Sequence, residues 1–135
     1  MEKGQSSVEF ITIFGFIFLM TVPLIIVFFD QMGAIEDSIS QAHLRNLAIK
    51  IADRAESVYY LGEPSKVNLQ AYFPEKLDSI EIVGREIIFN IRNSKGNVSQ
   101  VYAVANVNMS GNLSKEAGVH YIQIESADGY VVVTG

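Results

Sequence analysis

The sequence predicts an α+β fold in which one long N-terminal helix carries a small antiparallel β-sandwich-like head. Three observations support this prediction. Residues 10–29 form an uninterrupted run without any charged side chain. Apolar residues then recur at helical spacing as far as Val58. From Lys66 onward, apolar and polar residues alternate with a period of two, which is typical of strands.

The long helix is expected over residues 5–62. Its first part, residues 10–29, is long enough to cross about 30 Å of hydrocarbon. Pro23 lies inside this run, where it predicts either a simple kink or a place where the helix can melt. Beyond the run, apolar residues spaced three and four apart predict an amphipathic stripe that packs on the sheet: Met32, Ile35, Ile39, Ala42, Leu44, Ala48, Ile51, Ala55 and Val58. Gly62 and Pro64 predict the helix end.

Residues 63–135 are expected to form a β-rich globular head. Ile87, Phe89 and Ile91 alternate with other residues, and the pair Asp128-Gly129 is a strong hairpin signal. About 70 residues without disulfides make a marginal core. We therefore expect the amphipathic part of the helix to cover one face of the sheet.

Composition and charge exclude several classes of function. Fifteen acidic against ten basic residues give a net charge of −5, with no basic patch, so we expect no nucleic-acid partner. The absence of cysteine excludes disulfides, thiolate metal sites and cysteine nucleophiles. The two histidines, His43 and His120, match no metal-ligand spacing. No nucleophile motif or phosphate loop is present, so the sequence predicts no enzyme activity, no cofactor and no metal.

The apolar run is the first candidate functional segment. A secretory signal peptide has a shorter apolar region, of roughly 7–15 residues, followed by a small-residue cleavage site. Residues 30–33, DQMG, contain no such site. The simplest interpretation is a single-span membrane anchor that stays in the mature protein.

The residues before the run suggest a more specific interpretation. Lys3 and Gly4 end a short polar segment, and Glu9 stands directly against the apolar run. Ordinary anchors carry Lys or Arg at that border, and a carboxylate there is a functional candidate. Residues 3–10, KGQSSVEF, followed by the apolar run resemble the class III signal sequence of archaeal type IV prepilins.

This resemblance implies a processing event and a set of partners. A membrane-embedded prepilin peptidase would cut between Gly4 and Gln5, remove the leader 1–4, and leave Glu9 near the new N-terminus. Gln5 and Glu9 would then serve subunit assembly. The implied partners are identical or related pilin subunits, the membrane, an assembly ATPase and a platform protein. The precursor would lie in the cell membrane with its head outside, and the mature form in an extracellular surface filament.

Three N-x-[ST] sequons lie in the predicted head, at Asn97, Asn108 and Asn112. They favour an external, glycosylated surface, although polar loops also produce such sequences. Asn112 and its small polar neighbours are expected to form an exposed loop.

Two functional hypotheses from different classes follow. In the first, the chain is a structural subunit, a pilin or minor pilin that polymerises through its apolar helix. In the second, it is a single-span, membrane-anchored extracellular binding module that does not polymerise. The pair Gly4-Gln5 together with Glu9 discriminates between them, because a monomeric anchor needs none of these residues.

Overall fold

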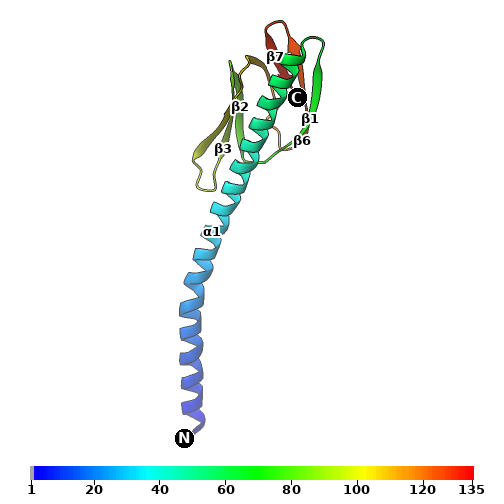
Figure 1. The fold of residues 1–135 in the computed structure, drawn as a ribbon. Helices are drawn as coiled ribbons and strands as arrows, with labels where there is room; N and C mark the ends of the chain where they lie inside the picture. Colours follow the sequence, from blue (N-terminus) through cyan, green and yellow to red (C-terminus); the bar gives the residue numbers. More distant parts are fainter. Residues whose placement is uncertain (1) are drawn as a thin grey trace. The chain divides into compact units, whose positions relative to one another are not determined.

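The computed structural model describes residues 2–135, with side chains from residue 6 onward. It has an α+β fold, in which helix α1 (Glu2–Leu61) precedes two small sheets (Figure 1). The chain divides into two compact units, the first extending to Glu36 and the second from Asp37 to Gly135. All of the strands belong to the second unit, together with the C-terminal part of α1.

Helix α1 is continuous from Glu2 to Leu61, although it contains a proline. Pro23 lies inside the helix, which is helical on both sides of it. The helix ends where Gly62 adopts a φ of 76°, a left-handed conformation that glycine enters without steric cost. The N–H of Gly62 then donates to the carbonyl of Tyr59 at 3.1 Å. The predicted end of the helix is thus confirmed at this glycine.

Seven strands follow within the described residues, and they form two sheets. Four of them pair in the order β1-β6-β7-β5, and three pair in the order β2-β3-β4. Their bounds are β1 Lys66–Phe73, β2 Leu77–Val83, β3 Glu86–Arg92, β4 Val98–Val104, β5 Met109–Asn112, β6 Gly118–Ala127 and β7 Tyr130–Thr134. All pairs are antiparallel except β5 and β7, which run parallel. The four-stranded sheet is therefore mixed.

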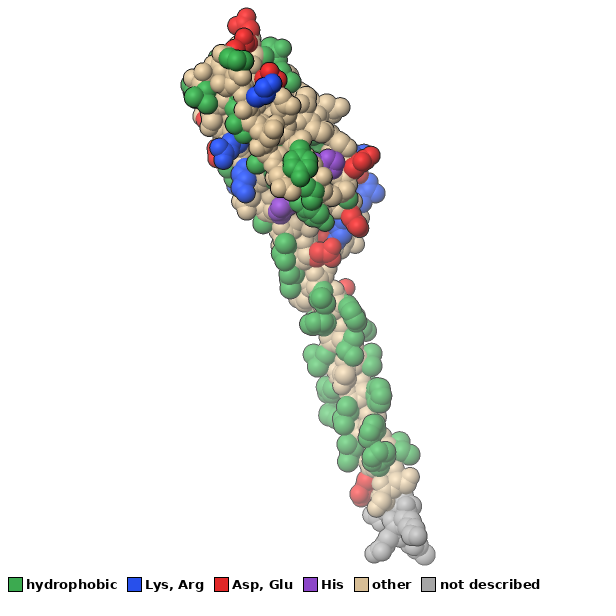
Figure 2. Space-filling model, turned by 90° about the vertical axis from the view of Figure 1, so that its right-hand side faces the viewer, with side chains coloured by type: hydrophobic (Ala, Val, Ile, Leu, Met, Phe, Trp, Pro, Cys, Tyr) green, Lys and Arg blue, Asp and Glu red, His purple; other side chains and the backbone are tan. Residues whose placement is uncertain are grey.

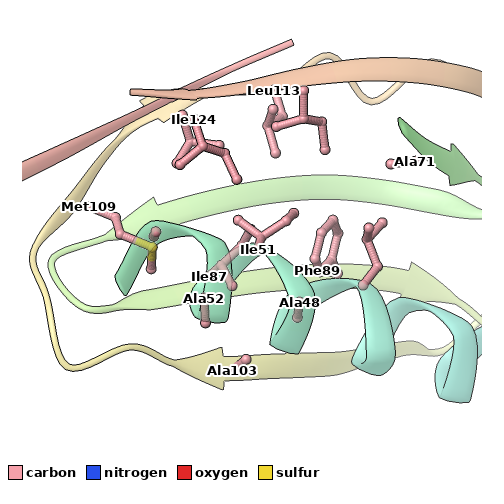
Figure 3. Packing of buried hydrophobic residues seen from close by; sticks show 14 of the residues in the cluster. Ala48, Ile51, Ala52, Ala71, Ile87, Phe89, Ala103, Met109, Leu113 and Ile124 are labelled. Atoms are coloured by element: carbon pink, nitrogen blue, oxygen red, sulfur yellow. The ribbon is translucent and has the colours of Figure 1, made fainter. Parts of the chain in front are cut away.

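The core lies where the C-terminal part of α1 packs against the inner faces of both sheets. Ile51 from α1, Phe89 from β3 and Ile124 from β6 are each fully buried in the same cluster (Figure 3). The strands supply alternate residues to this cluster, as the period of two predicts. Burial of the helix face against the sheets confirms the expectation that the head uses the helix to complete its core.

The amphipathic stripe is shorter than the sequence pattern suggests. Burial begins at Leu44, whereas Met32, Ile35 and Ile39 remain 52%, 57% and 66% exposed. The expectation that the whole stripe packs on the sheet is wrong for its first part. Ile39 and Leu44 are five residues apart, which is about 140° around a helix. They cannot face the same sheet, so the apparent single stripe is two stripes on different faces.

Candidate functional site: the N-terminal apolar helix

The apolar segment of α1 is uncovered. Every residue from 6 to 29 is exposed, and Leu19 and Leu24 reach 68% and 69% exposure. Figure 2 shows the hydrophobic side chains following one another along this segment. Among the described residues, one helix is long and apolar enough to cross a membrane. So near the N-terminus, such a segment fits a membrane anchor or a signal sequence.

Glu9 stands at the border of this segment. Its neighbours on the helix surface are Val8, Thr12 and Ile13. The Thr12 hydroxyl donates its hydrogen bond to the backbone carbonyl of Val8 at 2.8 Å and not to the Glu9 carboxylate. Glu9 is exposed and forms no hydrogen bond or ion pair with another described side chain. Any arrangement that takes the apolar segment out of water must therefore supply this carboxylate with a partner from elsewhere.

The predicted cleavage residues, Gly4 and Gln5, lie in α1, but their side chains are outside the described part of the structure. Cleavage between them, and the assembly role of Gln5, stay predictions.

The three sequon asparagines are exposed and lie at the ends of strands. Asn97 precedes β4, Asn108 precedes β5, and Asn112 is the last residue of β5. The expected loop at Asn112 is wrong, because this residue pairs with Thr134 of β7. Exposure leaves all three side chains accessible to modification, and their glycosylation stays a prediction.

The two histidines are held by backbone carbonyl groups. The His43 Nε2 lies 2.9 Å from the carbonyl oxygen of Tyr72, and the His120 Nε2 lies 2.7 Å from that of Glu116. No group of three or more histidine, cysteine or acidic side chains suited to a metal ion occurs in the described part of the chain.

Asp37 is a residue that the sequence analysis missed. Its carboxylate accepts the backbone N–H of Ser94 at 2.9 Å and the Ser94 hydroxyl at 2.8 Å. Lys76 Nζ donates to the same group at 3.3 Å. The backbone N–H of Ser94 is the main reason that the pKa of Asp37 lies below its ordinary value. No sequence signal identifies this contact, because 57 positions separate the two residues.

Comparison of the chain with protein-family models, with curated proteins and with solved structures finds no match.

Proposed function

We propose that the protein is a structural subunit, a pilin or minor pilin, of an archaeal type IV pilus-like surface filament. One observation carries the proposal: an exposed, charge-free helical segment is bordered by a lone carboxylate, Glu9, and preceded by Lys3-Gly4-Gln5. The fold adds support, since a β-rich head completed by the C-terminal part of α1 leaves the apolar part available for other contacts.

The apolar segment would serve the subunit in two states. As a precursor it would lie in the membrane, which satisfies a run of this length and hydrophobicity. In the filament, the same segments from many copies would pack side by side and cover one another. A surface that is uncovered in one copy is the feature that such packing requires.

Glu9 would set the register between copies. Cleavage after Gly4 would free the α-amino group of Gln5, a positive charge at a helix N-terminus. Burying an unpaired carboxylate costs several kcal/mol, so Glu9 would need that amino group from a neighbouring copy. A subunit in the wrong axial position would leave both charges unpaired.

The proposal includes the partners and location that this cycle requires. A prepilin peptidase would process the precursor in the cell membrane with the head outside. An assembly ATPase and a platform protein would drive incorporation into an extracellular filament. Glycans on Asn97, Asn108 or Asn112 would lie on the outer surface, consistent with the exposure of all three.

The test is the N-terminal mass of the protein together with electron microscopy of filaments sheared from producing cells. We expect the native chain to begin at Gln5 and to be present in filaments. Gly4→Val should remain uncut and absent from filaments, because a β-branched side chain prevents close approach of the backbone in a protease cleft.

Gly15→Val is the matched control for cleavage, because a Cβ added at Gly15 meets no atom within 4 Å. It should be cut like the native chain. A native chain that keeps Met1 and forms no filaments would contradict the proposal and favour a single-span, membrane-anchored extracellular binding module.

A further inference from the structure

The outer face of the four-stranded sheet carries a cluster of aromatic and uncharged polar side chains. Phe73 of β1 and Ile122 of β6 are fully buried, so their neighbours along each strand point away from the core. We name the outward set the tyrosine face, and it consists of Asn68, Gln70, Tyr72, Val119, Tyr121, Gln123 and Thr134. Figure 2 views the head from the side of β1, and uncharged atoms occupy the middle of that view with charged side chains around them.

Two tyrosine rings stand exposed on this face. Tyr121 is 71% exposed and Tyr72 is 52% exposed. Tyr121 lies opposite Gln70, and Tyr72 lies opposite Val119, so the two tyrosines are diagonal neighbours whose backbones are about 7–8 Å apart. The helix holds one of them in place, because the His43 Nε2 lies 2.9 Å from the Tyr72 carbonyl oxygen. Two rigid, flat and largely apolar surfaces are therefore offered side by side.

Carboxamide side chains surround the two rings. Asn68 and Gln70 lie on β1 and Gln123 lies on β6, and none of the three side chains hydrogen-bonds another described residue. Each carboxamide has two N–H donors and one acceptor oxygen, and Thr134 beside Gln123 adds a hydroxyl group. The face thus combines donors and acceptors without carrying a charge.

The tyrosine face differs in this respect from the outer face of the other sheet, where Glu81, Glu86 and Arg92 stand among the strand residues. At the end of the tyrosine face, Lys66 and Glu125 lie opposite each other, and their charged atoms are 3.9 Å apart. These two charges compensate each other. The face therefore selects neither an anionic nor a cationic partner.

We infer that the tyrosine face binds a neutral carbohydrate chain. A sugar ring has a face of C–H groups, which packs on an aromatic ring, and a rim of hydroxyl groups, each of which both donates and accepts. The carboxamides match this rim, because each offers donors and an acceptor together. The C–H faces of two linked sugar rings match the neighbouring rings of Tyr72 and Tyr121.

A protein partner fits this face less well. The buried centre of a protein interface is mainly apolar, whereas carboxamides adjoin both tyrosines here. An extended peptide would need free backbone groups to join the sheet, but β6 is already paired with β1 on one side and β7 on the other. Neutral hydroxyl groups are the partners that the exposed polar atoms lack.

A flat face favours a polymer over a single sugar. It contacts only one side of a sugar ring, so each contact is weak, and several contacts along one chain raise the overall affinity. The tyrosine face is complete in one copy of the protein. The inference therefore goes beyond the proposed function and does not depend on filament formation.

An array of immobilised neutral and anionic oligosaccharides tests the inference. The full chain is applied in phosphatidylcholine nanodiscs, because the headgroups of maltoside detergents are themselves sugars. We expect binding to at least one neutral oligosaccharide of two or more rings. Binding to no neutral oligosaccharide, or to anionic ones alone, would overturn the inference.

Variants on the face show whether the rings carry the contact. Tyr121→Ala should lower binding about tenfold, whereas Tyr121→Phe should retain most of it because the ring is kept. Gln70→Ala should also lower binding, since it removes donors and an acceptor. The matched control is Tyr60→Ala, which removes a tyrosine that is 74% exposed on α1, outside the face, and should leave binding unchanged. Equal binding by Tyr121→Ala and Tyr60→Ala would overturn the inference, provided that both variants show native circular dichroism.

This inference and the proposed function fail separately. Filaments built from a chain that binds no neutral oligosaccharide would leave the proposed function standing and refute the tyrosine face. Oligosaccharide binding by a chain that forms no filaments would support the tyrosine face and contradict the filament.

Discussion

Glu56 accepts two hydrogen bonds from one residue, Asn106. Its Oε1 atom lies 2.8 Å from the backbone nitrogen and 3.1 Å from Nδ2. Glu56 lies on α1 and Asn106 lies between β4 and β5, 50 positions later. This pair links the helix to the end of the three-stranded sheet beside the buried core residues Ala55, Ala105 and Val107.

Replacing Glu56 by alanine should destabilise the protein by about 1–2 kcal/mol, because hydrogen bonds to a charged acceptor are lost from a partly exposed site. Chemical unfolding of the full chain in detergent, followed by circular dichroism, measures this change. Glu63→Ala is the control, since Glu63 is exposed just beyond the helix, and its effect should stay within about 0.5 kcal/mol. Equal effects would show that the Asn106 contact contributes nothing.

Stability should fall in acid through Asp37. The pKa of this carboxyl is lowered in the folded chain, mainly by the backbone N–H of Ser94. Its contribution is therefore fully present above the ordinary value of 3.8 and is lost as the pH falls through the lowered folded value. Asp37→Asn should flatten the acid end of the stability curve, and unfolding midpoints at a series of pH values test this.

The control for Asp37 is Asp53→Asn on the same helix, because the exposed Asp53 side chain accepts no hydrogen bond from described residues. This variant should keep the acid dependence of the native chain. If Asp37→Asn keeps it as well, the contact with Ser94 does not control the acid response.

The predictable parts of the fold are those with a regular period. Phe89 and its alternate neighbours on β3 face the core as the period of two requires. The short strand β5 is not predictable from the local sequence. Gly111 and Asn112 are turn residues by local preference, and only pairing with the distant strand β7 makes them extended. Ile39 is a different case: its spacing from Met32 and Ile35 is helical, but it lies about 140° around the helix from Leu44, and only the Leu44 face packs on the sheets.

The candidate site residues also differ in whether the sequence alone reveals them. Glu9 could be found from sequence, because a carboxylate beside a charge-free run is a local and unusual arrangement. The contact between Asp37 and Ser94 could not, since 57 positions separate the two residues and only the folded chain brings them together.

Gly111→Ala should be strongly destabilising. A Cβ at this position would overlap the backbone carbonyl of Val133 in β7, and the φ of 147° is unfavourable for an L side chain. We expect a loss of several kcal/mol, because neither backbone can retreat without breaking the β5–β7 pairing. Thermal unfolding followed by circular dichroism measures the loss.

Gly96→Ala separates the clash from the backbone strain. Gly96 has a φ of 84°, but a Cβ there meets no atom within 4 Å. This variant should lose only about 1–2 kcal/mol. A loss at Gly111 no larger than the loss at Gly96 would mean that the close approach of β5 to β7 is unimportant.

The assembly role of Glu9 gives the sharpest prediction about function. Glu9→Gln keeps the shape of the side chain and removes its charge, whereas Glu9→Leu removes the polar requirement altogether. Both variants keep the charge-free run of residues 10–29, so both should enter the membrane and be cleaved like the native chain. They should nevertheless incorporate poorly into filaments when produced beside the native protein, because the charge that fixes the register with the amino group of Gln5 is missing.

Quantitative mass spectrometry of sheared filaments measures the ratio of variant to native subunits. Asp30→Asn, at the opposite border of the run, is the matched control and should incorporate at the native level. If the two Glu9 variants enter filaments as well as Asp30→Asn does, then Glu9 only marks the membrane border and register is set by the apolar side chains alone.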